Sequence, residues 1–124
     1  MDQFISEKPI YVQIMELIKK DIVSGKLKLN DPVSSVRELA MTYQVNPNTV
    51  QRALSECEKD GYLRSDRTSG RYVSADETTV KLLKESMLHE WVSSLVRQCQ
   101  DIGLEEHQVC ELIHRMYQKE GNPA

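Results

Sequence analysis

Two helix-start signals stand close together in the middle of the chain, and they constrain the fold more than any other feature. Ser35 and Glu38 fit a capping box, in which each side chain accepts a hydrogen bond from the other residue's backbone N–H. Asn46 provides a second cap, and Pro47 takes the first helical position, where a missing N–H costs nothing. Because only Gln44-Val45 links the two helices, the sequence predicts a helix-turn-helix.

The second of these helices, predicted over residues 46–59, has two different faces. One face is an apolar stripe that consists of Val50, Ala53, Leu54 and Cys57. The other face is polar and consists of Asn46, Asn48, Thr49, Gln51 and Arg52. Asn and Gln can bond adenine edges, and Arg can bond guanine edges or phosphate. The pattern therefore favours a recognition helix that reads DNA, and an ordinary capped surface helix is the alternative.

A β-hairpin is predicted directly after this helix. Segments 62–65 and 71–74 carry aromatic and β-branched residues, and the turn-forming segment 66–70 separates them. The hairpin carries three arginines, Arg64, Arg67 and Arg71. Because it follows a helix-turn-helix, we interpret the hairpin as a wing that contacts DNA phosphates or the minor groove. A solvated hairpin, with arginines that serve only solubility, is the alternative.

A core-facing helix is predicted near the N-terminus, after a loose arm over residues 1–8. It ends at Gly25, which suits a C-terminal cap. Its isoleucines recur every four residues and form one stripe, which consists of Ile10, Ile14, Ile18 and Ile22. In the connector over residues 26–32, Leu27 and Leu29 are expected to point inward.

Two amphipathic helices are predicted after the hairpin, one over residues 76–102 and one over residues 105–119, with Gly103 between them. Their apolar faces are too broad to be buried easily within one chain, so pairing with a second copy is the simplest solution. Folding back onto the N-terminal domain is the alternative. The expected dimer interface consists of Leu83, Met87, Leu88, Trp91, Leu95, Leu112, Ile113 and Met116. A frayed end is expected over residues 121–124.

The net charge of −3 is unevenly distributed. Residues 1–73 carry 11 basic and 10 acidic side chains, and residues 74–124 carry 5 basic and 9 acidic ones. DNA binding must therefore use a local patch in the N-terminal part. No secretory signal and no membrane span are visible, so the expected location is the cytoplasm. An odd number of cysteines without a CxxC pair argues for reduced, packed thiols.

Other chemistry finds little support in the sequence. Neither a Gly-rich phosphate loop nor a nucleophile–base set is visible, so neither an enzyme nor a cofactor is expected. His107, Cys110 and His114 share one helix face, but such spacings are mostly accidental and no metal site is predicted. The second functional hypothesis is a protein-interaction module that assembles a complex without specific DNA binding. A small-molecule effector is left open.

Taken together, these motifs resemble the GntR family of bacterial transcription regulators, over about residues 9–73. The shared motifs are Pro9-Ile10-Tyr11, Gly25-Lys26-Leu27, Ser35 to Ala40, Val45 to Leu54, Asp60 to Leu63 and Gly70 to Val73. The short two-helix tail and the Asn-Pro-Asn-Thr-Val run resemble the YtrA-type subfamily. The sequence departs from the family pattern at Ser34, Pro47 and Thr68, where relatives usually carry Pro, often Arg, and Gly.

This resemblance implies a mainly α fold with a small β-hairpin. Residues 1–74 would form a winged helix-turn-helix domain, and residues 75–124 would form a two-helix dimerisation tail. It implies that Arg37 contacts DNA backbone or a base, and that the polar face of the 46–59 helix reads the major groove. The wing tip would consist of Arg67, Thr68, Ser69 and Gly70, with Arg71 beside it. The family also implies a homodimeric repressor on a palindromic operator, often that of its own operon, which commonly encodes an ABC transporter.

Overall fold

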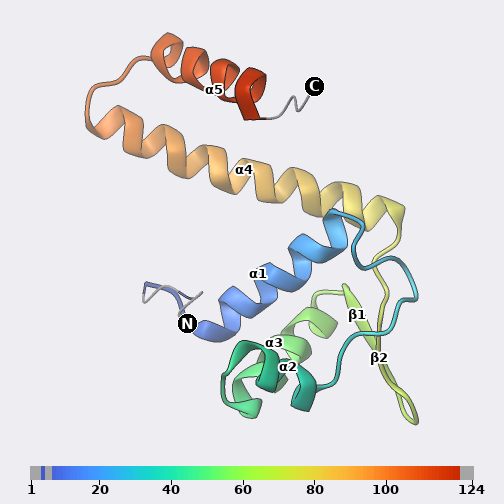
Figure 1. Ribbon diagram of the computed structural model, residues 1–124. Coiled ribbons are helices and arrows are strands. Elements are labelled where there is room, and N and C mark those ends of the chain that lie inside the picture. Colours follow the sequence, from blue (N-terminus) through green and yellow to red (C-terminus); the bar gives the residue numbers. More distant parts are fainter. Residues whose placement is uncertain (1–3, 5–6, 121–124) are drawn as a thin grey trace. The chain divides into compact units, whose positions relative to one another are not determined.

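The computed structural model describes residue 4 and residues 7–120 of the chain (Figure 1). The loose arm and the frayed end that the sequence predicts lie mostly outside these residues. The elements are α1 (Ile10–Val23), α2 (Val36–Tyr43), α3 (Pro47–Lys59), β1 (Leu63–Asp66), β2 (Gly70–Val73), α4 (Glu77–Asp101) and α5 (Glu106–Glu120). The predicted fold class, mainly helical with one antiparallel hairpin, is confirmed in the described part of the chain.

The chain divides into two compact units, residues 1–84 and residues 85–124. The first unit holds α1 to β2 and the first turns of α4, and the second holds the rest of α4 and α5. The sequence predicts a different kind of boundary, between a domain over residues 1–74 and a tail over residues 75–124. The division into compact units does not test it, so it stays a prediction.

The capped starts of α2 and α3 form as the sequence predicts. The Glu38 N–H donates to Ser35 Oγ over 3.1 Å, and the Ser35 N–H donates to Glu38 Oε1 over 2.9 Å. Asn46 Oδ1 accepts the Asn48 N–H at 2.7 Å. Between the helices, Gln44 adopts a left-handed conformation with φ of 57°, which ends α2 and turns the chain into α3.

The core of the first unit forms where α1 and α2 pack on α3. The predicted apolar stripe of α3 is confirmed, because Val50, Ala53, Leu54 and Cys57 are completely buried. The beginning of α4 also packs on this core through Val80. This burial fixes which face of α3 remains outside.

Two predictions for the core were wrong. Ile10, the first residue of α1, is 42% exposed, because it lies at the end of the helix beside a surface hollow. Leu29 is 50% exposed and lies in a turn that the Asp31 N–H closes by donating to the Lys28 carbonyl over 2.9 Å. Leu27 does pack against the core as predicted.

The wing is a two-stranded hairpin in which Leu63 pairs with Val73 and Asp66 with Gly70. The connector between α1 and α2 lies along its β2 strand, a pairing that the sequence does not predict. The Asn30 N–H donates to the Val73 carbonyl, and the Val73 N–H donates to the Asp31 carbonyl, both over 2.9 Å. The base of the wing is thereby attached to the rest of the first unit.

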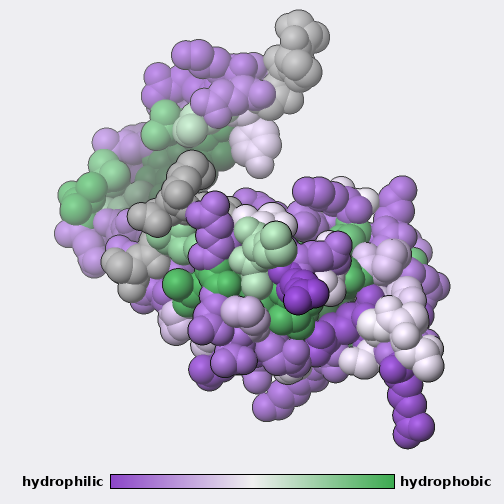
Figure 2. All heavy atoms as spheres, turned by 60° about the horizontal axis from the view of Figure 1, so that its bottom comes forward, coloured by the Kyte–Doolittle hydropathy of each residue, from purple (hydrophilic) through white to green (hydrophobic). Residues whose placement is uncertain are grey.

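In the second unit, a turn at Gly103, where φ is 79°, separates α4 from α5, and α5 then returns in the opposite sense (Figure 1). Many large hydrophobic side chains of this unit are exposed, and hydrophobic surface is visible on it between hydrophilic patches (Figure 2). Within the described residues, no helix is long and apolar enough to cross a membrane.

Candidate nucleic-acid interface

The polar face of α3 stands outside the core, at the N-terminal end of the helix. Asn48, Gln51 and Arg52 are exposed, and Thr49 is half-buried. Asn46 is exposed too, but its Oδ1 atom caps the helix, so its NH₂ group is the part that can meet a partner. The sequence prediction thus named side chains that the structure does bring together on one surface.

Arg52 is held by a residue that the sequence analysis did not include in the site. Its guanidinium carbon lies 3.8 Å from the centroid of the Tyr11 ring, and its Nη2 donates to the Tyr11 hydroxyl over 3.2 Å. These two side chains line a hollow of about 380 Å³ together with Ile10, Asn48 and Thr49. The N-terminal end of α1 therefore belongs to the same surface as the polar face of α3.

Arg37 is exposed in the first turn of α2. A cation there faces the positive end of the helix dipole, so helix stability does not account for it. The adjacent Glu38 is committed to the capping box. Hydrogen bonds from the backbone and then the side chain of Ser35 hold the pKa of Glu38 below its ordinary value.

The wing tip is shaped by Asp66. Its Oδ1 atom accepts both the backbone N–H and the hydroxyl of Thr68, each at 3.0 Å. Tyr72 donates its hydroxyl hydrogen to Ser69 Oγ over 2.7 Å, and Gly70 has φ of 105°, a conformation that L side chains rarely adopt. The threonine at position 68 therefore strengthens the turn with its own hydroxyl. Arg67 is exposed at this tip.

The other two wing arginines are engaged within the fold. Arg71 forms a salt bridge through its Nε with Glu58 on α3, and its side chain is only 19% exposed. Arg64 donates to Asn30 Oδ1 over 3.4 Å and lies 4.9 Å from the centroid of the Tyr72 ring. Because Arg71 is engaged by Glu58 and largely buried, whereas Arg67 is exposed at the tip, Arg67 is the wing arginine with the most accessible guanidinium.

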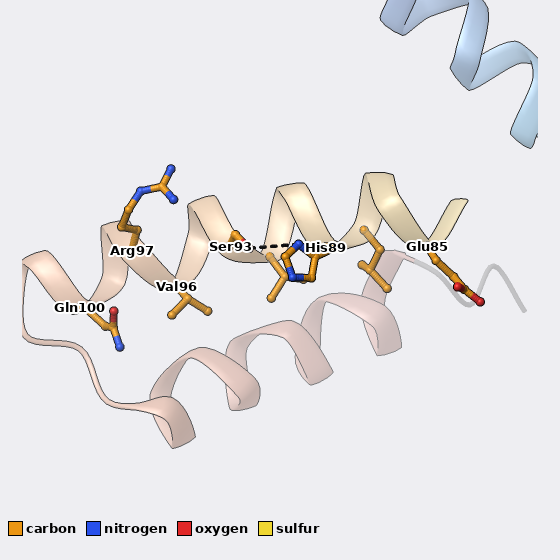
Figure 3. Close-up of a pocket in the computed structure, with 8 residues that line it drawn as sticks. Glu85, His89, Ser93, Val96, Arg97 and Gln100 are labelled. Atoms are coloured by element: carbon orange, nitrogen blue, oxygen red, sulfur yellow. Dashed lines mark hydrogen bonds between the residues drawn. The ribbon is translucent and has the colours of Figure 1, made fainter. Parts of the chain in front are cut away.

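The expected dimer-interface side chains of the second unit are largely accessible. The exposed ones are Leu88, Trp91, Leu95, Leu112, Ile113 and Met116, and Met87 is half-buried. Along α4 they continue into a groove of about 630 Å³ (Figure 3), whose lining includes the apolar residues Leu88, Val92 and Val96 and the polar residues His89 and Arg97. Leu83, which belongs to the first unit, differs, because it is only 5% exposed within the single chain and offers little area to a partner.

Within the described residues, no group of three His, Cys, Asp or Glu side chains is placed to hold a metal ion. His107, Cys110 and His114 all lie exposed on α5. Cys57 is buried in the core of the first unit, and this burial raises the pKa of its thiol to about 12.

The sequence matches known regulators over most of its length. The model of the bacterial regulatory proteins of the gntR family matches residues 10–73. The HTH-type regulator YhcF of Bacillus subtilis is 37% identical over 112 residues, which cover 90% of this chain and 93% of that protein. The transcriptional repressor YtrA of Bacillus subtilis is 36% identical over 109 residues, which cover 87% of this chain and 84% of YtrA.

Solved structures share the fold. A GntR family transcriptional regulator from Listeria monocytogenes aligns with a TM-score of 0.83 and 29% identity, over 90% of this chain and 98% of that chain. The DNA-binding domain of AraR, solved in complex with the operator ORR3, aligns with a TM-score of 0.52 and 26% identity. That alignment covers 59% of this chain and 86% of the AraR chain.

Proposed function

The chain belongs to the GntR family of bacterial regulatory proteins, whose members are transcription regulators and not enzymes, and from this we propose that it is a homodimeric repressor that binds a palindromic operator. Membership of this family shows that the chain is a DNA-binding transcription regulator. Its assembly, its operator and its regulated genes are the proposed part. Because operator DNA lies on the chromosome, we place its action in the cytoplasm.

One observation carries the proposal for DNA reading. The apolar stripe of α3 is completely buried, so the polar N-terminal face of the same helix must point outward. There Asn48, Thr49 and Gln51 offer amide and hydroxyl groups of the kind that read base edges in the major groove. Asn46 adds its NH₂ group, and Arg37 and Arg52 supply charge for phosphates or guanine edges.

The wing adds a second contact. Arg67 extends from a tip that Asp66 and Thr68 stabilise, next to the Ser69-Gly70 backbone. We assign this tip to the minor groove or its phosphates. We assign Arg71 to keeping the wing in place, because Glu58 holds its guanidinium.

Two observations, charge and exposed apolar area, support the proposed homodimer. The near-neutral N-terminal part offers few phosphate contacts, so a single copy would bind DNA weakly. The exposed apolar residues of α4 and α5 are of the type that a second copy would cover. A two-fold dimer presents two identical recognition helices, which a palindromic site matches. In this arrangement residues 1–74 bind DNA and residues 75–124 dimerise.

The regulated genes are proposed from the relatives. The similarity to a repressor named YtrA supports a repressor, and the resemblance to its subfamily supports control of the protein's own operon, which would encode an ABC transporter. No small-molecule effector is assigned.

The test is a gel shift with the promoter upstream of the protein's own gene. We expect a specific complex that an excess of unrelated duplex does not displace, and whose affinity falls steeply between about 50 and 200 mM salt. Absence of a specific complex at every salt concentration would contradict binding at this site. A complex formed equally well with unrelated duplex would contradict a specific operator there.

A further inference from the structure

We propose that Tyr11 on α1 is a positioning residue for DNA recognition, because it holds the guanidinium of Arg52 in the orientation in which Arg52 meets DNA. The inference rests on the proposed contact of Arg52 with DNA. It extends the reading surface from the helix-turn-helix to the first helix of the domain.

The geometry of the pair is specific. The two residues are 41 positions apart in sequence, and the packing of α1 on α3 brings them together. The guanidinium carbon lies 3.8 Å from the centroid of the Tyr11 ring, and the Nη2–Oη hydrogen bond is 3.2 Å long. The guanidinium thus has two contacts with one side chain, one over the face of the ring and one to the ring's hydroxyl, and together they restrict where it lies.

The two partners differ in how firmly the fold holds them. Tyr11 is half-buried and packs against the core, whereas Arg52 is exposed. An exposed arginine loses much rotamer freedom when it binds a partner. Because the Tyr11 ring packs on the core, it already restricts the rotamers of Arg52 in the free protein. Arg52 therefore loses less conformational entropy when it binds DNA.

The contact leaves Arg52 able to bind. Arginine has five N–H donors, and the hydrogen bond to the Tyr11 hydroxyl uses one donor of Nη2, so the other donors can meet a partner. Arg52 and Tyr11 line the same hollow as Asn48 and Thr49, two of the proposed reading residues. The oriented cation therefore borders the surface that faces DNA.

A purely structural role is the competing explanation, in which the stack only helps α1 to pack on α3. The two explanations differ in a double-mutant cycle. A positioning residue acts through Arg52, so its substitution loses its effect once Arg52 is gone. A packing residue costs the same affinity whether Arg52 is present or not.

The experiment measures duplex affinity for the full chain, for Tyr11→Phe, Tyr11→Leu and Arg52→Ala, and for the double variants. The probe is the duplex that the wild-type chain selects from a random-sequence library. We expect Arg52→Ala to weaken binding about fivefold to a hundredfold. Tyr11→Leu should weaken it about threefold to tenfold alone and have no further effect beside Arg52→Ala. Tyr11→Phe, which keeps the ring, should lie between wild type and Tyr11→Leu.

Lys19→Gln is the matched control. Lys19 also lies on α1 and its Nζ stands 5.6 Å from the centroid of the Tyr62 ring, so this change removes a cation–ring contact away from the hollow. It should leave affinity for the selected duplex within about twofold of wild type. Thermal unfolding of each variant shows whether it is folded, and Tyr11→Phe keeps the test decisive if Tyr11→Leu does not fold.

Equal losses from the Tyr11 substitutions with and without Arg52 would overturn the inference while the proposed function stands. Unchanged affinity in Arg52→Ala would overturn it too, since Arg52 would then not touch DNA. Failure of the wild-type chain to select any duplex would refute sequence-specific binding itself, so the two failures are distinguishable.

Discussion

Glu58 on α3 forms a salt bridge with Arg71 on β2, the second strand of the wing. Ser65, on the first strand, also donates its hydroxyl hydrogen to Glu58. A single carboxylate thus connects α3 to both strands of the hairpin. This carboxylate helps to hold α3 and the wing in a fixed relative position, and these are the two elements proposed to enter adjacent grooves.

Removing this carboxylate should destabilise the domain. Glu58→Ala leaves the partly buried Arg71 guanidinium without its partner, and we expect a loss of about 1–3 kcal/mol in the free energy of unfolding. The control is Glu16→Ala, which removes the exposed ion pair of Glu16 with Lys8 and should cost less than about 1 kcal/mol. Urea denaturation measures both. Equal costs for the two variants would show that the Glu58 contact has no special role.

Stability should fall in acid. Burial alone would raise the pKa of Glu58, but the hydrogen bonds from Ser65 and Arg71 and the charge of Arg71 hold it below its ordinary value of 4.5. The backbone N–H groups of Thr68 and Thr79 lower the pKa of Asp66 and Asp76, respectively, from 3.8. A carboxyl whose pKa is lower in the folded than in the unfolded state stabilises the fold above the unfolded pKa.

That stabilisation is lost as pH falls through the folded pKa. We therefore expect the carboxyl contribution to stay constant from neutral pH to about pH 5 and then to decline. Urea denaturation at several pH values, compared between wild type and Glu58→Gln, isolates the share of Glu58. The difference between the two proteins should shrink below about pH 4.5, and a difference that grows there would contradict the ion pair.

The cysteines should differ in reactivity. Cys57 is completely buried and the pKa of its thiol is raised to about 12, so it carries almost no thiolate at neutral pH. Cys110 is exposed on α5. In a thiol-reagent assay on the native protein, Cys110 should react quickly and Cys57 only after denaturant is added. Cys110→Ala should remove the fast phase, and fast modification of Cys57 in the native state would contradict the packing of the core.

Arg67 should contribute a non-specific contact at the wing. Its proposed partner is phosphate, so Arg67→Ala should weaken binding to specific and unrelated duplexes alike and reduce the salt slope by about 1. Arg64→Ala is the control, because Arg64 is engaged with Asn30 and Tyr72 and should change the slope less. A salt slope that Arg67→Ala leaves unchanged would remove the wing tip from the interface.

Local signals made much of this fold predictable. Ser35 with Glu38, and Asn46 with Pro47, act within a few residues of each other, so the sequence alone places the two helix starts. The apolar residues of α3 also lie within a few positions of each other, so their spacing identified the buried face of the helix. The polar side chains that remain outside were identified with it.

Contacts between distant segments were not predictable in this way. Periodicity predicts which face of α1 carries Ile10. It does not show that this residue lies at the end of the helix, where its neighbours leave it 42% exposed. The residues around Asn30 and Asp31 are turn formers, so the sequence predicts a turn there and not the backbone hydrogen bonds that these two residues form with β2. In the candidate site, a count of arginines cannot tell Arg67 at the tip from Arg71, which an acid on another element engages.

Two copies of the chain are proposed to bind one operator, and sedimentation of the full chain with the duplex it selects tests this assembly. We expect two chains per duplex, and an inverted repeat in the selected sequence. Trp91→Glu, which puts a charge where a 56% exposed indole stands on α4, should yield monomers that bind the same duplex far more weakly. One wild-type chain per duplex, or a Trp91→Glu protein that still sediments as a dimer and binds as tightly, would contradict the proposed assembly.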